Sequence, residues 1–191
     1  MTDSKIWGPY AWYMMHEIAF NLQQTYDKLP SKISKYLRVF YTGLHALLPC
    51  PSCRTHYGWT LSKYPLNKYN RSGISMAKWT VTAHNLVNQG LKKKTYTYSN
   101  AKKLYLRRGV ATINHKKLSE FIRYILEKTN TAPLATRKSV ASVFIHLYPC
   151  HKCRTRLQLH ASKNPIYTVK TSRDMNNWAQ RLRWVAQVQC K

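Results

Sequence analysis

Acidic side chains are scarce in this 191-residue chain, where 6 Asp and Glu stand against 32 Lys and Arg and the formal net charge is +26. A surface so dominated by one sign of charge attracts polyanions such as nucleic acids or acidic proteins. No basic run is typical of a helix that reads DNA or of a zinc finger, so we do not expect sequence-specific DNA recognition. A polyanion or an acidic protein stays open as a partner.

Long apolar runs are also missing, and no stretch reaches the length that a membrane-spanning helix needs. The first residues, MTDSKIWGPYAW, lack the charged-then-apolar pattern of a secretory signal. We therefore expect a soluble protein, cytoplasmic or nuclear, that is made and kept in a reducing compartment. In such a compartment a CxxC motif is more often redox-active or metal-binding than structural.

Strand-like alternation is absent, whereas apolar residues recur at helical spacing along the chain. One apolar stripe stops at Pro49, and another follows Pro9, which suits the first turn of a helix. The motif GxGxxG is missing, as is a strand to carry it, which excludes a Rossmann dinucleotide site. The pattern predicts an all-α protein. The clearest stripes are Trp12, Met15, Ala19 and Leu22; Ile33, Leu37, Phe40, Leu44 and Leu47; and Met76, Trp79, Ala83 and Leu86.

A CxxC motif occurs twice, 100 positions apart, within two related segments. LLPCPSCRTHYGWTLSKYPL (47–66) and LYPCHKCRTRLQLHASKNPI (147–166) are identical at nine of twenty positions without a gap. This is an internal duplication. We predict a four-helix bundle at 1–98, a basic connection at 99–116 and a second helical bundle at 117–191. Each unit is near the size at which a core alone is marginal, so the halves should pack on each other.

Three chemistries suit the first motif, Cys50-Pro51-Ser52-Cys53. An amphipathic segment starts near Cys53, and a helix N-terminus favours the thiolate form of a cysteine. A redox dithiol that exchanges with incoming thiols is the first interpretation. A zinc site with His56 as a third ligand is the second, although zinc ribbons usually pair one CxxC with another nearby. A purely structural disulfide is the third.

A redox dithiol needs a two-electron acceptor, and flavin is a cofactor that fills this role. In an all-helical protein a flavin site must use aromatic and polar side chains on helix faces. His84 and Asn88 are four residues apart, so they share one face of a predicted helix. Taken singly, His84, Trp79 and Trp12 are better explained as core residues, and it is their combination with CxxC that favours a cofactor site.

Four motifs in order make residues 7 to about 98 resemble the Erv/ALR family of FAD-dependent sulfhydryl oxidases, in the compact form found in large DNA viruses. The CxxC alone is weak evidence, but its place between the flanking motifs is specific. They are Trp7-Gly8-Pro9-x-x-Trp12-x-x-x-His16; Cys50-Pro51-Ser52-Cys53; Trp79-x4-His84-Asn85-x-Val87-Asn88; and Leu91-x-Lys93-x-x-Tyr96.

The resemblance implies a fold and a set of roles. The family packs four helices and a short fifth around FAD, so Cys53 would lie beside the flavin and Cys50 would be the outer sulfur that substrate thiols attack. Electrons would pass to oxygen and give hydrogen peroxide. If the chain is viral, the host cell or the virion would be its location. The residues implied to bind the cofactor are Gly8, Trp12, His16, His84, Asn85, Val87, Asn88, Lys93 and Tyr96, with Lys93 near its phosphates.

The second half keeps its CxxC and departs from the pattern elsewhere. Arg183, Trp184 and Gln187 replace the histidine and the two asparagines. Phe121 and Ile125 stand where the first half has Trp12 and His16, in a looser alignment. We expect no FAD here. The half resembles the degenerate Erv-like module of quiescin-type and baculoviral oxidases, although in those proteins the degenerate module precedes the active one. It would take the place of the second subunit of a homodimer. A true homodimer also stays open.

The other cysteines have several interpretations. Cys150 and Cys153 could form a structural disulfide, a relay between substrate and Cys50–Cys53, or a reduced or metal-bound pair. Cys190 makes the cysteine count odd. It could be a shuttle thiol, a link between subunits or a bystander.

Two functions from different classes compete. The first is an FAD-linked thiol oxidase that acts on protein substrates. The alternative is a basic binding module, in which structural or zinc-bound CxxC pairs hold a helical surface that engages nucleic acid or an acidic partner. Bound flavin and salt-sensitive binding to polyanions distinguish the two.

Overall fold

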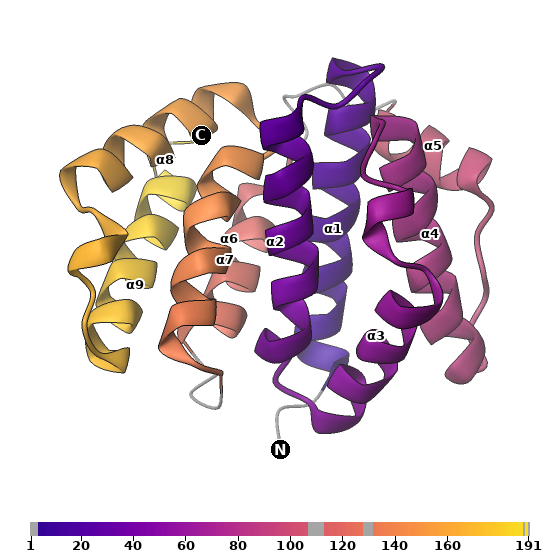
Figure 1. The fold of residues 1–191 in the computed structure, drawn as a ribbon, viewed down its shortest axis with the longest axis horizontal. Helices are drawn as coiled ribbons and strands as arrows, with labels where there is room; N and C mark the ends of the chain where they lie inside the picture. Colours follow the sequence, from indigo (N-terminus) through magenta and orange to yellow (C-terminus); the bar gives the residue numbers. More distant parts are fainter. Residues whose placement is uncertain (1–3, 107–112, 128–131, 189, 191) are drawn as a thin grey trace.

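The computed structural model describes residues 4–106, 113–127, 132–188 and 190, and these form helices and no strand (Figure 1). The all-α prediction is therefore confirmed. The helices are α1 (Ser4–Thr25), α2 (Ser31–Leu47), α3 (Pro51–Lys63), α4 (Gly73–Gly90), α5 (Tyr98–Leu106), α6 (His115–Ile122), α7 (Leu134–Leu147), α8 (His151–Lys163) and α9 (Ser172–Val188). Three short helical turns, Leu66–Lys68, Arg123–Glu127 and Ile166–Thr168, lie between them.

The first helix begins earlier than the sequence suggested. Its first residue is Ser4, so Pro9 lies inside the helix rather than in its first turn. A proline near the start of a helix removes only one intrahelical hydrogen bond. The side chain of Trp7 is only 6% exposed and packs into the core, and this burial stabilises the helical turn that precedes the proline.

The two CxxC segments are built alike. The order α2, α3, short turn, α4 in the first half matches α7, α8, short turn, α9 in the second. Trp79 Nε1 donates to the carbonyl oxygen of Tyr64 at 2.7 Å. In the same way Trp178 Nε1 donates to the carbonyl oxygen of Asn164 at 2.9 Å. Each tryptophan thereby joins the last helix of its half to the end of the CxxC helix.

The halves pack on each other chiefly through α2 and α7, which lie side by side at the centre of Figure 1. The rings of Phe40 and Phe144 stack with centroids 6.0 Å apart. Gly43 meets Val140 so closely that no Cβ would fit there. Phe40 of α2 and Val140 of α7 are equivalent positions of the repeat, because they are 100 residues apart. The two helices therefore contact each other through equivalent positions, as they would at the interface of a two-fold symmetric dimer. One continuous cluster of buried residues spans both halves.

The predicted connection at 99–116 is partly helical. Its first residues belong to α5, which packs against α1 and α4, and residues 107–112 lie outside the described residues. The division of the chain into domains stays a prediction.

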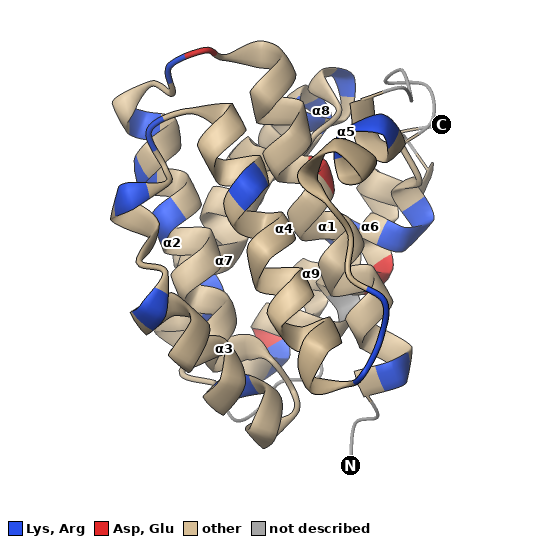
Figure 2. Ribbon diagram, turned by 90° about the vertical axis from the view of Figure 1, so that its right-hand side faces the viewer, with Lys and Arg blue, Asp and Glu red and all other residues tan. Residues whose placement is uncertain are grey.

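Lysine and arginine are spread over many helices and loops, and acidic residues are few (Figure 2). Within the described part of the chain, no helix has both the length and the apolar character to cross a membrane.

Helices α1 and α4 approach each other closely at Gly73, the first residue of α4. A Cβ at this position would lie 2.5 Å from the backbone nitrogen of Gln23 and 2.5 Å from the carbonyl oxygen of Leu22. Backbone atoms cannot move aside as a flexible side chain can. Glycine at position 73 therefore sets the distance between the two helices.

Replacing Gly73 with alanine should lower the free energy of unfolding by about 1–3 kcal/mol, because the added methyl group forces α1 and α4 apart. Gly90→Ala is the matched control, since Gly90 ends the same helix and a Cβ added there would meet no atom within 4 Å. The control should be neutral or stabilising, by up to about 1 kcal/mol. Urea unfolding of both variants measures this, and equal stabilities would contradict the close approach.

Candidate functional site

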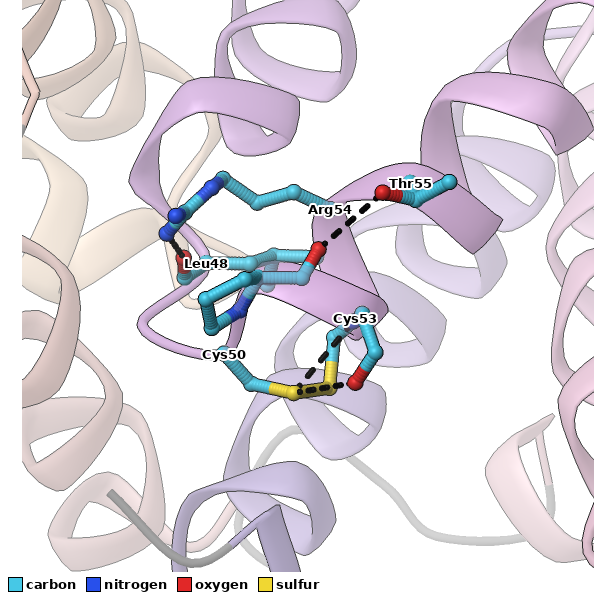
Figure 3. The surroundings of a disulfide bond; sticks show 7 residues. Leu48, Cys50, Cys53, Arg54 and Thr55 are labelled. Carbon is cyan, nitrogen blue, oxygen red and sulfur yellow. Dashed lines mark hydrogen bonds between the residues drawn. A yellow bond between two sulfur atoms is a disulfide. The ribbon is translucent and has the colours of Figure 1, made fainter. Parts of the chain in front are cut away.

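The first CxxC lies at the start of α3 and forms a disulfide between Cys50 and Cys53 (Figure 3). Cys50 is the N-cap residue, and its Sγ accepts a hydrogen bond from the backbone N–H of Cys53 at 3.3 Å. The hydroxyl of Ser52 lies 3.1 Å from the same sulfur. Both cysteines are half-buried, so the disulfide is held by the fold and still reaches the surface.

The position of the disulfide favours thiol exchange. The first turn of a helix carries unpaired N–H groups and a partial positive charge, which stabilise a thiolate when the disulfide is opened. The side chain of Arg54 binds the backbone, where its Nη1 donates to the carbonyl oxygen of Leu48 at 2.7 Å. It braces the turn that joins α2 to α3 (Figure 3).

Two histidines meet between α1 and α4. Nε2 of His16 lies 3.0 Å from Nδ1 of His84, a hydrogen bond across the two helices. The indole of Trp12 stacks on the ring of His84, with centroids 4.2 Å apart and planes within 4°. The structure thus brings together three of the residues predicted to bind the cofactor.

Both imidazoles are neutral at pH 7. Burial, and then the neighbouring His84, lower the pKa of His16 to about 3. Burial, and then the charge of Lys93, lower the pKa of His84 to about 4. A hydrogen bond between two neutral imidazoles uses one donor and one acceptor, so the two outer nitrogens are left as one donor and one acceptor. Among the described residues, Nδ1 of His16 is buried and has no partner.

The two asparagines of α4 hold the segment that follows the helix. Asn85 donates from Nδ2 to the carbonyl oxygen of Tyr96 at 2.7 Å and accepts the backbone N–H of Tyr96 at 3.0 Å. Asn88 donates to the carbonyl oxygen of Lys94 at 3.1 Å. Lys92 has a left-handed backbone (φ 53°), which turns the chain back so that the N–H of Lys93 reaches the carbonyl of Asn88.

The other predicted cofactor residues are placed less specifically. Asn85 binds the backbone of Tyr96, and the side chain of Tyr96 is exposed. Lys93 is exposed and acts on His84 through its charge. Gly8 is half-buried with open space around its Cα, and Val87 is half-buried on α4. Their roles in cofactor binding stay predictions.

The sequence patterns missed Tyr105, on α5. Its ring stacks on His16 with centroids 5.0 Å apart, and on Phe20 at 5.2 Å. Tyr98, seven residues earlier, also stacks on Phe20. Seven residues are two helical turns, so the spacing of Tyr98 and Tyr105 was the available signal that α5 belongs to this cluster.

The donor set between α1 and α4 suits a flavin. It combines a stacked aromatic pair, Trp12 and His84, with the two outer nitrogens of the neutral histidine pair, one a donor and one an acceptor, of which Nδ1 of His16 is buried without a partner among the described residues. A heteroaromatic ring with polar edges needs these groups. FAD therefore fits the chemistry of the residues present. Two surface hollows lie elsewhere, one along α9 and one beside the start of α2.

The second CxxC has the same turn and different surroundings. Cys150 is the N-cap of α8, and its Sγ lies 3.5 Å from the backbone N–H of Cys153. Cys150, Cys153 and Cys190 are all free thiols and all buried. Burial, with hydrogen bonds to Cys190 and Cys150, raises the pKa of Cys153, so little of it is thiolate at pH 7. The predicted disulfide, relay and shuttle roles of these cysteines stay predictions.

Among the described residues of α6 and α9, no pair of histidines corresponds to His16 and His84. Gln187 donates to the hydroxyl of Ser119 at 2.7 Å, which closes the contact between the helices. Arg183 lies 4.0 Å from the carboxylate of Glu127, and the side chain of Trp184 is exposed. Phe121 and Ile125 are core residues.

The structure does not support the zinc alternative for the first motif. Within the described ranges, the one group of three or more His, Cys, Asp or Glu side chains close enough to share a metal ion contains neither Cys50 nor Cys53. His56 packs beside Trp59.

Comparison with known proteins places the same residues in one family. The sequence model of the Erv1 / Alr family matches residues 9–106. A probable FAD-linked sulfhydryl oxidase of Acanthamoeba polyphaga mimivirus is 37% identical over 98 residues, which are 50% of this chain and 65% of that protein. An FAD-linked sulfhydryl oxidase of African swine fever virus is 32% identical over 117 residues, 61% of this chain and 92% of that protein. No solved structure matches significantly.

Lowering the pH should destabilise the protein through the histidine pair. The unfolded chain binds protons at both histidines below about pH 6.5, whereas the folded chain binds them only near pH 3 at His16 and near pH 4 at His84. Unfolding is therefore favoured as the pH falls from about 6.5, by up to about 2 kcal/mol per histidine between pH 7 and pH 5. Urea unfolding at pH 7 and at pH 5 should show that His16→Asn and His84→Asn lose less free energy of unfolding over this interval than the unaltered protein does. His151→Asn changes an exposed histidine and is the control. If both variants lose as much free energy of unfolding as this control does, the histidine pair does not cause the effect.

Removing the side chain of Asn85 should release the segment that follows α4. Asn85→Ala loses two hydrogen bonds to Tyr96, worth about 1 kcal/mol each. Hydrogen exchange at the amide of Tyr96 should then become about tenfold faster or more. Gln89→Ala, on an exposed position of the same helix, is the control and should leave that amide unchanged. Equal exchange in the two variants would count against this role of Asn85.

Proposed function

Because the chain belongs to the Erv1/Alr family, we propose that it is an FAD-dependent thiol oxidase that forms disulfides in protein substrates. The observation that carries the proposal is the joint presence, within residues 9–106, of a disulfide at a helix N-terminus and a neutral histidine pair, of which His84 stacks on Trp12. Relatives named FAD-linked sulfhydryl oxidases support it. The match spans 65% of the mimivirus relative, less than two thirds of its length.

The first step is thiol–disulfide exchange at Cys50. A substrate thiolate attacks Cys50 Sγ, the bond to Cys53 breaks, and Cys53 leaves as a thiolate stabilised by the N-terminus of α3. A second substrate thiolate then attacks the substrate sulfur of the mixed disulfide and releases Cys50. The substrate gains one disulfide, and the Cys50–Cys53 pair gains two electrons.

The reduced pair must be oxidised again. Bound FAD would supply the two-electron acceptor, and we propose oxygen as the final acceptor and hydrogen peroxide as the product. Cys53 would face the cofactor, while Trp12, His16, His84 and Asn88 hold it. His16 and His84 remain neutral and offer one donor and one acceptor, so they can orient a ring without adding charge.

The second half serves a different role in this proposal. Its repeated CxxC turn and tryptophan hydrogen bond support an origin as a copy of the first half. The hydrogen bond from Gln187 to Ser119 joins α9 directly to α6, and Phe121 is a core residue, which supports the expectation that this half binds no FAD. It instead covers α2, as a dimer partner would.

The basic surface is compatible with the oxidase function and does not require the protein to be a binding module. The binding-module alternative is not favoured, since the family match covers the cysteine pair and the histidine cluster together. We propose that the +26 charge attracts acidic substrate proteins or polyanions to the oxidase, in the cytoplasm or the nucleus.

Oxygen consumption with dithiothreitol tests the proposed reaction. Cys50→Ser and Cys53→Ser should each lower turnover by at least about 100-fold, since neither variant can form the disulfide at the start of α3. Both should keep their bound flavin. Ser62→Ala, an exposed change on α3, is the control with unchanged turnover. Turnover that survives in both cysteine variants would contradict the assignment.

A further inference from the structure

Three buried thiols and one imidazole converge in the second half. Cys150 and Cys153 lie at the start of α8, His115 is the first residue of α6, and Cys190 follows α9. The three cysteines are 6%, 2% and 6% exposed. Ligand atoms of His115, Cys153 and Cys190 all lie within 4.8 Å of one another. Neither the family match at 9–106 nor the proposed reaction uses these residues.

The distances approach those of a tetrahedral metal site. Sγ of Cys153 lies 3.9 Å from Nδ1 and 3.9 Å from Nε2 of His115. Around zinc, with bonds of about 2.3 Å to sulfur and about 2.0 Å to nitrogen, a sulfur and a nitrogen lie roughly 3.5 Å apart. Shifts of a few tenths of an ångström would bring these ligands to one ion.

A neighbouring hydroxyl fixes which nitrogen of His115 is available. Nδ1 lies 2.9 Å from the hydroxyl of the buried Tyr148, and the two rings are parallel within 5°. When Nδ1–H donates to that hydroxyl, Nε2 keeps its lone pair for a metal. Histidine ligands in metal sites are commonly oriented by such a second hydrogen bond.

Cys150 completes the set as the fourth ligand. It lies outside the 4.8 Å group, but the two-residue spacing of CxxC is the one by which zinc sites take two thiolates from a single turn. A set of three sulfurs and one nitrogen selects zinc among the common divalent ions.

The two halves use the same turn differently. Cys50 and Cys53 are half-buried and bonded to each other, which suits exchange with a substrate. Cys150 and Cys153 are buried, unbonded and accompanied by Cys190 and His115, which the first half does not match. Burial of all three thiols opposes a relay, because an attacking thiol must reach the sulfur.

We propose that Cys150, Cys153, Cys190 and His115 bind a structural Zn²⁺ that fastens the end of the chain after α9 to α6 and α8. The ion replaces the redox disulfide of the first half with a closed, redox-inert link. This proposal is independent of the oxidase function.

Metal analysis of the purified full-length chain tests the site. We expect about one zinc per chain, as in other closed four-ligand sites. Cys153→Ala, Cys190→Ala and His115→Ala should each lose most of it. Cys50→Ala changes the equivalent turn of the first half and should keep its zinc. Zinc that persists in all three ligand variants, or that Cys50→Ala also loses, would overturn the proposal.

A second measurement uses the unaltered chain, in case the variants do not fold. Co²⁺ exchanged into the protein should give the ligand-field bands of a tetrahedral thiolate site, at longer wavelength than flavin absorption. Alkylation in the native state should spare Cys150, Cys153 and Cys190 until a strong chelator removes the metal. Purification without zinc, together with a disulfide among these three cysteines by mass spectrometry, would refute the site.

Discussion

The packing of α1 against α4 is the constraint on which the proposed site depends. Gly73 lets the two backbones approach, and that approach puts His16 within 3.0 Å of His84. At this separation burial keeps both rings neutral, with Trp12 stacked on one of them. A residue with a side chain at position 73 would separate the helices and, with them, the histidine pair.

The duplicated CxxC turn shows how surroundings decide the chemistry of a motif. In both halves the first cysteine caps a helix and its sulfur faces the N–H of the second. In the first half the pair is half-buried and forms a disulfide. In the second it lies buried beside His115, Tyr148 and Cys190. Identical local geometry thus serves a site for thiol exchange in one half and, in our proposal, a metal link in the other.

Much of the fold could be predicted from the sequence, because apolar spacing reports helices directly. The helix around Trp12 was predicted, but its start was not, since Pro9 signals a first turn and the burial of Trp7 overrides it. The meeting of His16 and His84 followed only from family motifs, as no local pattern links residues 68 positions apart. Tyr105 was missed although its seven-residue spacing from Tyr98 was a signal, whereas the meeting of His115 with Cys153 and Cys190 was missed because tertiary packing alone brings these residues together.

In our proposal only the first half forms a flavin site, and this site is connected to Cys50–Cys53. The most direct measurement is the visible spectrum of the purified chain, recorded without oxygen before and after adding dithiothreitol, with flavin and protein quantified. We expect about one FAD per chain, because the chain has a single proposed site, and loss of the flavin absorbance on reduction. A colourless protein, two flavins per chain, or a flavin that dithiothreitol does not bleach would contradict it.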